Sequence, residues 1–231
     1  MANHFLETTK GQLIISCQAL ADEPLHSSFI MARMAKAAYE AGASAIRANS
    51  VVDVQAIMDT VPLPVIGLDK VDYPDAPIYI TPTLKEMRGI AATGAAVVAC
   101  DVTGRPRPNG EQLETIVATM RAEYSETLLM ADTASLADVE ESNRLGFDLV
   151  GTTMYGYTPA TVGCNIADND FDYLKKVLAL SKVPVIAEGK IDSPEKAAAV
   201  LKLGCHSVVV GSSITRPQLI AKHYVDAIQV K

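Results

Sequence analysis

Short apolar segments alternate with longer amphipathic segments eight times along the chain. Each apolar segment is rich in aliphatic and β-branched residues and is about as long as a typical strand. The segments begin near Leu13, Ser44, Leu63, Ala95, Thr127, Phe147, Val183 and Ser207. Their apolar residues follow one another almost without interruption, which is typical of parallel strands that helices cover on both faces. The pattern therefore predicts eight buried parallel strands.

The longer segments have the spacing of amphipathic helices. They are rich in Ala, Leu, Lys and Glu, and their apolar residues recur at helical intervals. The clearest of them cover residues 29–42, 84–94, 113–124, 136–146, 173–182 and 194–204. A capping hydroxyl, a proline and an acid mark the start of the last one, at Ser193, Pro194 and Glu195. Glycines able to end a helix in the left-handed conformation precede four strands, at Gly42, Gly94, Gly146 and Gly204.

Eight such units without a linker or a change in composition predict one catalytic domain over residues 1–231. Right-handed crossovers between parallel strands would curl the units into a closed (β/α)8 barrel, the TIM barrel of the α/β class. An open doubly wound sheet is the alternative. The first strand-to-helix turn lacks the GxGxxG of dinucleotide-binding sheets, and the regularity of the units favours closure.

Polar residues gather where the predicted strands end, which is where TIM barrels carry their chemistry. These ends hold Gln18, Arg47, Lys70, Asp101, Asp132, Thr152, Thr153, Glu188, Gly211, Ser212 and Ser213. Side chains two positions apart share one face of a strand, so Lys70 shares the face of Ile66 and Leu68. By the same parity, Asp132 and Glu188 extend the apolar rows of their own strands. If these rows line the barrel, their charges converge over its mouth.

Each of these residues also fits an ordinary structural role. Taken alone, Lys70 fits a solvated loop cation, Asp132 a helix cap, and Glu188 a turn acid with a neighbouring salt bridge. Arg47 fits an ion pair with either acid, and for Asp101 we favour an Asx turn over a catalytic role. Four charges at the same end of four strands would repel each other or lose hydration at high cost without a purpose. We therefore predict that Lys70, Arg47, Asp132 and Glu188 act together.

The segment after the last strand, VGSSITRP at residues 210–217, predicts a phosphate-binding barrel. Such barrels hold the anion between the loops after strands seven and eight, beside a short extra helix. Gly189 and Gly211 allow a close backbone approach, Ser212 offers a hydroxyl donor, and Arg216 offers a charge-assisted contact. The alternative is a surface loop followed by a helix that begins at Arg216 and Pro217.

Composition narrows the class of partner. A net charge of −7 without a basic run excludes a nucleic-acid or anionic-membrane footprint and favours a small molecule. No window approaches the ~20 apolar residues of a membrane span, and the first residues lack a signal peptide, so we expect a cytoplasmic protein. The four cysteines have no CxxC spacing and predict reduced, mostly buried thiols. The four histidines lack ligand spacing, so we predict no metal site.

Several long segments resemble the N-acetylmannosamine-6-phosphate 2-epimerase family of bacterial sialic-acid catabolism. They span nearly the whole chain, at residues 11–18, 22–30, 45–48, 64–73, 130–132, 145–158, 185–191 and 214–217. The resemblance implies a cofactor-independent homodimer that interconverts N-acetylmannosamine 6-phosphate and N-acetylglucosamine 6-phosphate. It also implies a catalytic lysine and glutamate at Lys70 and Glu188, and substrate-binding residues at Gln18, Arg47, Asp132 and Arg216. The sequence departs from the family pattern at Ser212 and Ser213, where Gly and Ala are expected, and at Asp69, where an apolar residue is expected.

These residues suit the implied chemistry. The proton beside the acetamido group becomes acidic only when the sugar ring opens to an adjacent aldehyde, so ring opening and proton transfer both need acid–base groups. A base works best when its pKa lies near the working pH, which burial and Arg47 would achieve for Lys70. We expect Lys70 to remove and return the proton and Glu188 to assist ring opening. Arg47 and Asp132 would orient the acetamido group, and Arg47 would stabilise negative charge.

Three other functions stay open from the sequence. Two are enzymes on the same fold, a thiamine-phosphate synthase-like transferase and a ribose-phosphate isomerase; the transferase would use an acidic metal–pyrophosphate site. The third is a barrel that binds a phosphosugar without turnover, because fold alone does not prove catalysis. The sequence also leaves open whether one lysine or two groups serve the opposite faces of the inverted carbon. The C-terminal helix, expected over residues 218–228, is a candidate dimer contact.

Overall fold

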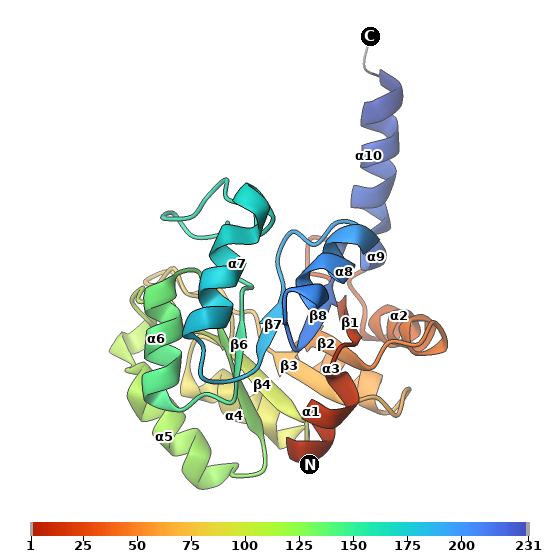
Figure 1. Cartoon of the computed structure of the whole chain (residues 1–231). Coiled ribbons are helices and arrows are strands. Elements are labelled where there is room, and N and C mark those ends of the chain that lie inside the picture. Colours follow the sequence, from red (N-terminus) through yellow and green to blue (C-terminus); the bar gives the residue numbers. More distant parts are fainter. Residues whose placement is uncertain (1, 230–231) are drawn as a thin grey trace.

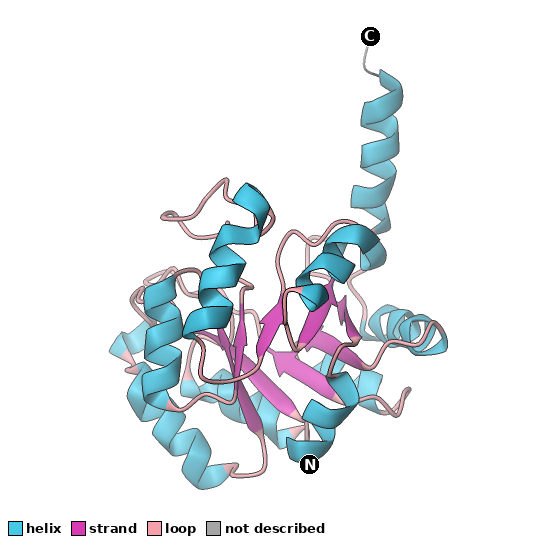
Figure 2. Cartoon of the chain, in the orientation of Figure 1, coloured by secondary structure: helices cyan, strands magenta, loops and turns pink. Residues whose placement is uncertain are grey.

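The computed structural model describes residues 2–229, and its strands close into one parallel barrel. Each strand pairs with the next in sequence, and β8 pairs with β1 (Figure 2). The strands are β1 (Leu13–Cys17), β2 (Ala45–Asn49), β3 (Val65–Leu68), β4 (Val97–Asp101), β5 (Leu128–Asp132), β6 (Leu149–Gly151), β7 (Val185–Ala187) and β8 (Ser207–Val210). The predicted (β/α)8 barrel is confirmed. Three residues of the predicted domain, Met1, Val230 and Lys231, lie outside the described residues.

Helices surround the barrel and alternate with its strands (Figure 1). They are α1 (Ala2–Thr9), α2 (Ser28–Glu40), α3 (Val51–Met58), α4 (Leu84–Ala92), the short η1 (Pro108–Gly110), α5 (Leu113–Glu123), α6 (Leu136–Leu145), α7 (Asp168–Leu180), α8 (Pro194–Lys202), α9 (Ser212–Thr215) and α10 (Pro217–Gln229). All six predicted helices are present. The sequence pattern did not reveal α3, which begins directly after β2 with two β-branched valines that are more typical of a strand.

Alternate strand residues point into the barrel and form its apolar interior. They include Ile14, Ala45, Ile66, Leu68, Val97, Ala99, Leu128, Met130, Leu149, Ile186 and Val209. Phe5 of α1 is fully buried in the same cluster, and α1 lies at the end of the barrel from which the strands start (Figure 1). The predicted parity is therefore correct, and the inward rows lead to Lys70, Asp132 and Glu188 at the opposite end.

Local signals in the sequence set the helix ends as predicted. The four helix-ending glycines have φ values of 92°, 83°, 76° and 109°, all in the left-handed region. Ser193 caps α8, and its hydroxyl accepts a hydrogen bond from the Lys196 N–H at 3.3 Å. In α7 the residues Asn169, Asp170 and Phe171 have left-handed backbone, so the regular helix begins near the predicted start at Tyr173.

Helix α10 extends away from the barrel beyond the carboxyl ends of the strands (Figure 1). None of its described side chains is buried, and its exposed apolar residues include Tyr224, Val225 and Ile228. Within residues 2–229, no helix combines the length and the apolar character needed to cross a membrane.

The contact between β3 and α4 leaves no room for a side chain at Gly67. An added Cβ would overlap the buried Ile90 Cγ2 methyl. We predict that Gly67→Ala lowers the free energy of unfolding by about 1–3 kcal/mol, measured by urea denaturation, because a packed β-branched side chain has to shift. Gly89→Ala is the matched control, since its Cβ would lie 3.4 Å from Val51 Cγ2 and alanine favours the helix. Equal stability of the two variants would contradict this account.

Candidate active site

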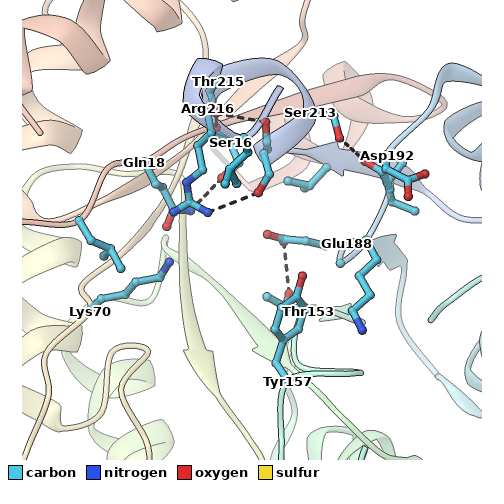
Figure 3. A pocket seen from close by; sticks show the side chains of 18 of the residues that line it. Ser16, Gln18, Lys70, Thr153, Tyr157, Glu188, Asp192, Ser213, Thr215 and Arg216 are labelled. Atoms are coloured by element: carbon cyan, nitrogen blue, oxygen red, sulfur yellow. Dashed lines mark hydrogen bonds between the residues drawn. The ribbon is translucent and has the colours of Figure 1, made fainter. Parts of the chain in front are cut away.

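A cavity of about 1230 Å³ opens at the carboxyl ends of the strands, where the sequence predicted the site. The predicted residues that line it are Gln18, Lys70, Glu188, Gly189, Gly211, Ser212 and Arg216. Lys70 and Glu188 extend into the cavity from opposite sides (Figure 3). One cavity therefore brings together the predicted acid–base pair and the predicted phosphate-binding segment.

Lys70 continues the inward row of β3 at the point where the strand ends. Burial lowers the pKa of its amine from 10.5 to about 8, and the positive charges of Arg47 and Arg216 act in the same direction. Glu188 and Asp132 oppose this shift without reversing it. Lys70 is half-buried and lines the cavity, and its lowered pKa suits a base near neutral pH, which favours the base over a solvated loop cation.

Glu188 continues the inward row of β7, and its carboxyl group accepts a hydrogen bond from the Thr153 hydroxyl at 3.2 Å. Burial raises the pKa of Glu188 to about 7, although the Arg47 charge acts to lower it. Glu188 does form an ion pair, as the structural alternative predicted, but with Arg47 of β2 at 3.0 Å and not with Lys190. The nearby Lys190 amine donates instead to the Cys164 carbonyl oxygen at 2.5 Å.

Arg47 and Asp132 form a buried ion pair beneath the cavity. Arg47 Nη2 donates to Asp132 Oδ2 at 2.6 Å and Nη1 to Oδ1 at 3.2 Å. Arg47 Nη1 also lies 3.0 Å from Glu188 Oε2. The side chains of Arg47 and Asp132 are 1% and 0% exposed, and neither residue lines the cavity. The two predicted substrate-binding residues thus contact Glu188 and each other.

Strand register explains this depth. Asp132 pairs with Gly151 and Gly151 with Ile186, so Asp132 lies one inward position below Glu188. Gly151 also leaves room for the ion pair, because an added Cβ there would overlap the Met130 side chain and approach Asp132 Oδ1 to 3.3 Å. The helix-cap interpretation of Asp132 is wrong.

Two other polar residues have the structural roles that such positions often have. Ser135, rather than Asp132, caps α6 and accepts a hydrogen bond from the Asp138 N–H at 3.2 Å. Asp101 Oδ1 accepts hydrogen bonds from the Thr103 N–H at 2.8 Å and the Thr103 hydroxyl at 2.6 Å. This confirms the expected Asx turn at Asp101, which also pairs with Arg105 at 2.6 Å.

The segment after β8 lies along the cavity rather than in an unrelated surface loop. Helix α9 begins at Ser212, and Arg216 Nη1 donates to the Ser212 hydroxyl at 3.3 Å. Arg216 Nη2 also donates to Glu23 Oε2 at 2.8 Å (the surroundings of Arg216 are shown in Figure 3). Glu23 belongs to the loop after β1, and our sequence reasoning missed it because only the fold brings this loop next to α9.

Other cavity residues were missed as well. Tyr79 and Tyr157 line the cavity from the loops after β3 and β6, and the Lys190 amine lies 5.5 Å from the Tyr157 ring centre. Neither tyrosine has a motif, although aromatic residues in loops after barrel strands are a weak signal for a binding site. Among residues 2–229, no group of three or more His, Cys, Asp or Glu side chains is placed to hold a metal ion.

Comparisons with known proteins agree on one family. A family model described as "Putative N-acetylmannosamine-6-phosphate epimerase" matches residues 31–230. A relative from Latilactobacillus sakei, named "Putative N-acetylmannosamine-6-phosphate 2-epimerase", is 86% identical over 99% of both chains. A relative of the same name from Lactiplantibacillus plantarum is 68% identical over 99% of this chain and 100% of its own length.

Solved structures extend the comparison to the fold. The structure of an N-acetylmannosamine-6-phosphate 2-epimerase from Clostridium perfringens matches with a TM-score of 0.92 and 47% identity, over 97% of this chain and 96% of that one. A thiamine phosphate pyrophosphorylase from Pyrococcus furiosus matches with a TM-score of 0.58 and 16% identity, over 96% of this chain and 99% of that one. At that identity the likeness shows the barrel fold alone.

The raised pKa of Glu188 predicts a specific pH dependence of stability. The folded protein holds this proton up to about pH 7, whereas an unperturbed carboxyl group releases it near 4.5. Stability that Glu188 contributes below 4.5 is therefore lost as the pH rises to about 7. The difference in free energy of unfolding, wild type minus Glu188→Gln, should fall across this window and be constant above it.

Urea denaturation at several pH values measures this difference, and Glu141→Gln is the control. The hydrogen bond from Arg144 lowers the pKa of Glu141, so its contribution changes below pH 4.5. A Glu188 difference that stays constant between 4.5 and 7 would contradict the raised pKa.

Proposed function

The chain belongs to the N-acetylmannosamine-6-phosphate epimerase family, and from this we propose that it interconverts N-acetylmannosamine 6-phosphate and N-acetylglucosamine 6-phosphate. The single domain would perform this step of sialic-acid catabolism in the cytoplasm. The main support is the pair of groups on opposite sides of the cavity, Lys70 with a pKa lowered to about 8 and Glu188 with a pKa raised to about 7. Such a pair supplies a base and an acid near neutral pH.

The proposed reaction exchanges one proton at the carbon that bears the acetamido group. Glu188 assists opening of the sugar ring to the aldehyde by handling protons at the ring oxygens. Neutral Lys70 then removes the proton, and the electron pair of the broken C–H bond delocalises into the neighbouring carbonyl group. A proton then returns to the opposite face of the carbon, from Lys70 after the intermediate rotates or from Glu188 or a sugar hydroxyl. This restores the aldehyde with inverted configuration, and the ring closes again.

Arg47 and Asp132 act on this reaction through Glu188. Their side chains are buried and paired, and Arg47 Nη1 lies 3.0 Å from Glu188 Oε2. We therefore revise the sequence-based hypothesis that they orient the acetamido group. In this proposal the ion pair fixes the Glu188 carboxyl group, and the Arg47 charge limits how far burial raises the pKa of Glu188.

Gln18 is the polar residue best suited to contact the sugar. Its Nε2 donates to the Ser16 hydroxyl at 2.9 Å, and its buried Oε1 has no protein partner among the described residues. Gln18 also lines the cavity. A buried acceptor without a partner costs free energy until a donor arrives, which favours a substrate N–H or O–H group at this position.

The phosphate group of the substrate would bind in the same cavity, along the segment after β8. Gly189 has a φ of 99° and brings the backbone after β7 close to the cavity. The backbone of Gly211 packs against Ser16, and a Cβ added to Gly211 would crowd the Ser16 side chain. Ser212 supplies a hydroxyl and Arg216 a guanidinium group that suits a phosphate. This arrangement would leave the sugar carbons between Lys70 and Glu188.

The deciding experiment for the activity is turnover in heavy water with a chelator present, followed by proton NMR. We expect both epimers to form and the product to carry deuterium at the inverted carbon. Lys70→Ala should lose about 100-fold or more of kcat, because the base is absent. Lys85→Ala is the control, since its side chain is 86% exposed and outside the cavity. A fully active Lys70→Ala variant would remove the base assignment, and absence of epimerisation by the wild type would remove the proposed function.

We also propose that the chain forms a homodimer through α10. The exposed Tyr224, Val225 and Ile228 give this helix an apolar surface that the described barrel does not cover. Sedimentation velocity should give twice the chain mass of 24.6 kDa, and Ile228→Asp should shift the species toward the monomer. Lys222→Ala changes an exposed residue of the same helix and should leave the dimer intact. A monomeric wild type at micromolar concentration would exclude this dimer.

A further inference from the structure

The backbone of Lys70 is held by a side chain that the proposed chemistry does not otherwise involve. The Lys70 N–H donates to Asn49 Oδ1 at 2.8 Å. Asn49 is the last residue of β2 and is buried. It lies on the same strand face as Arg47, two positions along. A single amide thus connects the end of β2 to the residue that we propose as the base.

This hydrogen bond stands in for one that the barrel ladder lacks. The Ser50 N–H donates to the Leu68 carbonyl oxygen at 2.8 Å, so the regular parallel pattern would continue from the Lys70 N–H to the Ser50 carbonyl oxygen. That oxygen instead accepts from the Val54 N–H at 3.0 Å, because α3 starts immediately. Ser50 turns the chain into this helix with a φ of 72°. The Asn49 side chain supplies the missing acceptor.

The other edge of the Lys70 segment is fixed independently. The loop after β3 returns as an antiparallel partner, with Lys70 opposite Ile80. Thr81 donates through its N–H to the Asp69 carbonyl oxygen at 2.7 Å and through its hydroxyl to the Ala99 carbonyl oxygen of β4 at 2.6 Å. Its φ of 45° is in the left-handed region, which a threonine adopts only where its surroundings enforce it. Lys70 is therefore held from β4 through this return segment and from β2 through Asn49.

We propose that Asn49 is a positioning residue for Lys70 and sets the direction in which its amine enters the cavity. The inference rests on the proposed role of Lys70 as the base. A lysine side chain is long and flexible, so its amine reaches a reproducible position only if the backbone is fixed. Misplacement of a reacting group by about 1 Å costs about 100-fold in rate.

Two substitutions separate positioning from charge. Asn49→Ala removes the acceptor, whereas Asn49→Asp keeps an oxygen at the same place and adds a negative charge beside Lys70. The charged groups that already act on this amine come from four other parts of the chain, namely Arg47, Asp132, Glu188 and Arg216. An added carboxylate favours the protonated amine, so Asn49→Asp should raise the pKa of Lys70 above its value of about 8.

The expected result is a split in kinetic parameters measured across pH. Asn49→Ala should lose about tenfold to a hundredfold in kcat with a KM within about threefold of the wild type. Asn49→Asp should recover most of kcat at high pH, with the acid limb of its pH profile at higher pH than in the wild type. Competitive acetylation measures the pKa of the Lys70 amine without turnover, and it should also give a higher pKa in Asn49→Asp than in the wild type.

Asn143→Ala is the matched control. The Asn143 Oδ1 also accepts a backbone hydrogen bond, from the Lys182 N–H at 2.9 Å, but it lies outside the cavity lining. This variant should lose thermal stability and keep the wild-type kcat and pH profile. Asn49→Ala with kcat within twofold of the wild type, or Asn49→Asp with an unshifted Lys70 pKa, would overturn the inference. Inactivity of the wild type would instead concern the proposed function, and acetylation would still test Asn49.

Discussion

The ion cluster of Arg47, Asp132 and Glu188 is the constraint on which the rest of the site depends. Removing three charged groups from water costs several kcal/mol for each group. Their mutual attraction offsets this cost only when the geometry of the contacts is close to ideal. Their contacts of 2.6 and 3.0 Å join β2, β5 and β7 around one guanidinium group. The cluster holds one cation and two carboxylates. Burial raises the pKa of Glu188, and the Asp132 charge acts in the same direction, although Arg47 lies 3.0 Å from Glu188 Oε2. The second cation is Lys70 across the cavity, and its positive charge acts to lower the pKa of Glu188.

The barrel converts this electrostatic arrangement into a fixed spatial one. Below the cluster, the interior is filled by apolar side chains from the strands, and Phe5 is buried among them. Above it, the loops after the strands supply Gln18 and Arg216, which lie at the cavity surface. The proposed acid–base pair therefore lies directly at the strand ends, whereas groups suited to substrate recognition are on the loops. This division allows recognition to vary without disturbing the pair.

The sequence predicted the strands well, because strands buried on both faces have continuous apolar runs that few other structures produce. Parity within those runs correctly placed Lys70, Asp132 and Glu188 on inward rows. It did not predict depth, because the level of Asp132 relative to Glu188 depends on register between different strands. For the same reason Glu23 and Asn49 were missed. Their partners, Arg216 and Lys70, are distant in sequence or come from a neighbouring strand, and the bonds that join them have no local pattern.

The closed lower end of the barrel has a consequence for isotopes. Below the buried Arg47–Asp132 pair the described interior is apolar and packed. In the proposed reaction, water would therefore reach the Lys70 amine through the cavity mouth, where we propose that the sugar binds. A proton that the proposed base Lys70 takes up would then exchange with solvent only as fast as water passes the bound sugar. The deuterium content of the first product molecules therefore depends on two rates. One is the rate at which the abstracted hydrogen returns to the carbon, and the other is the rate at which solvent enters. The packing around Phe5, far from the proposed reacting atoms, would therefore influence how much solvent deuterium the first product molecules contain.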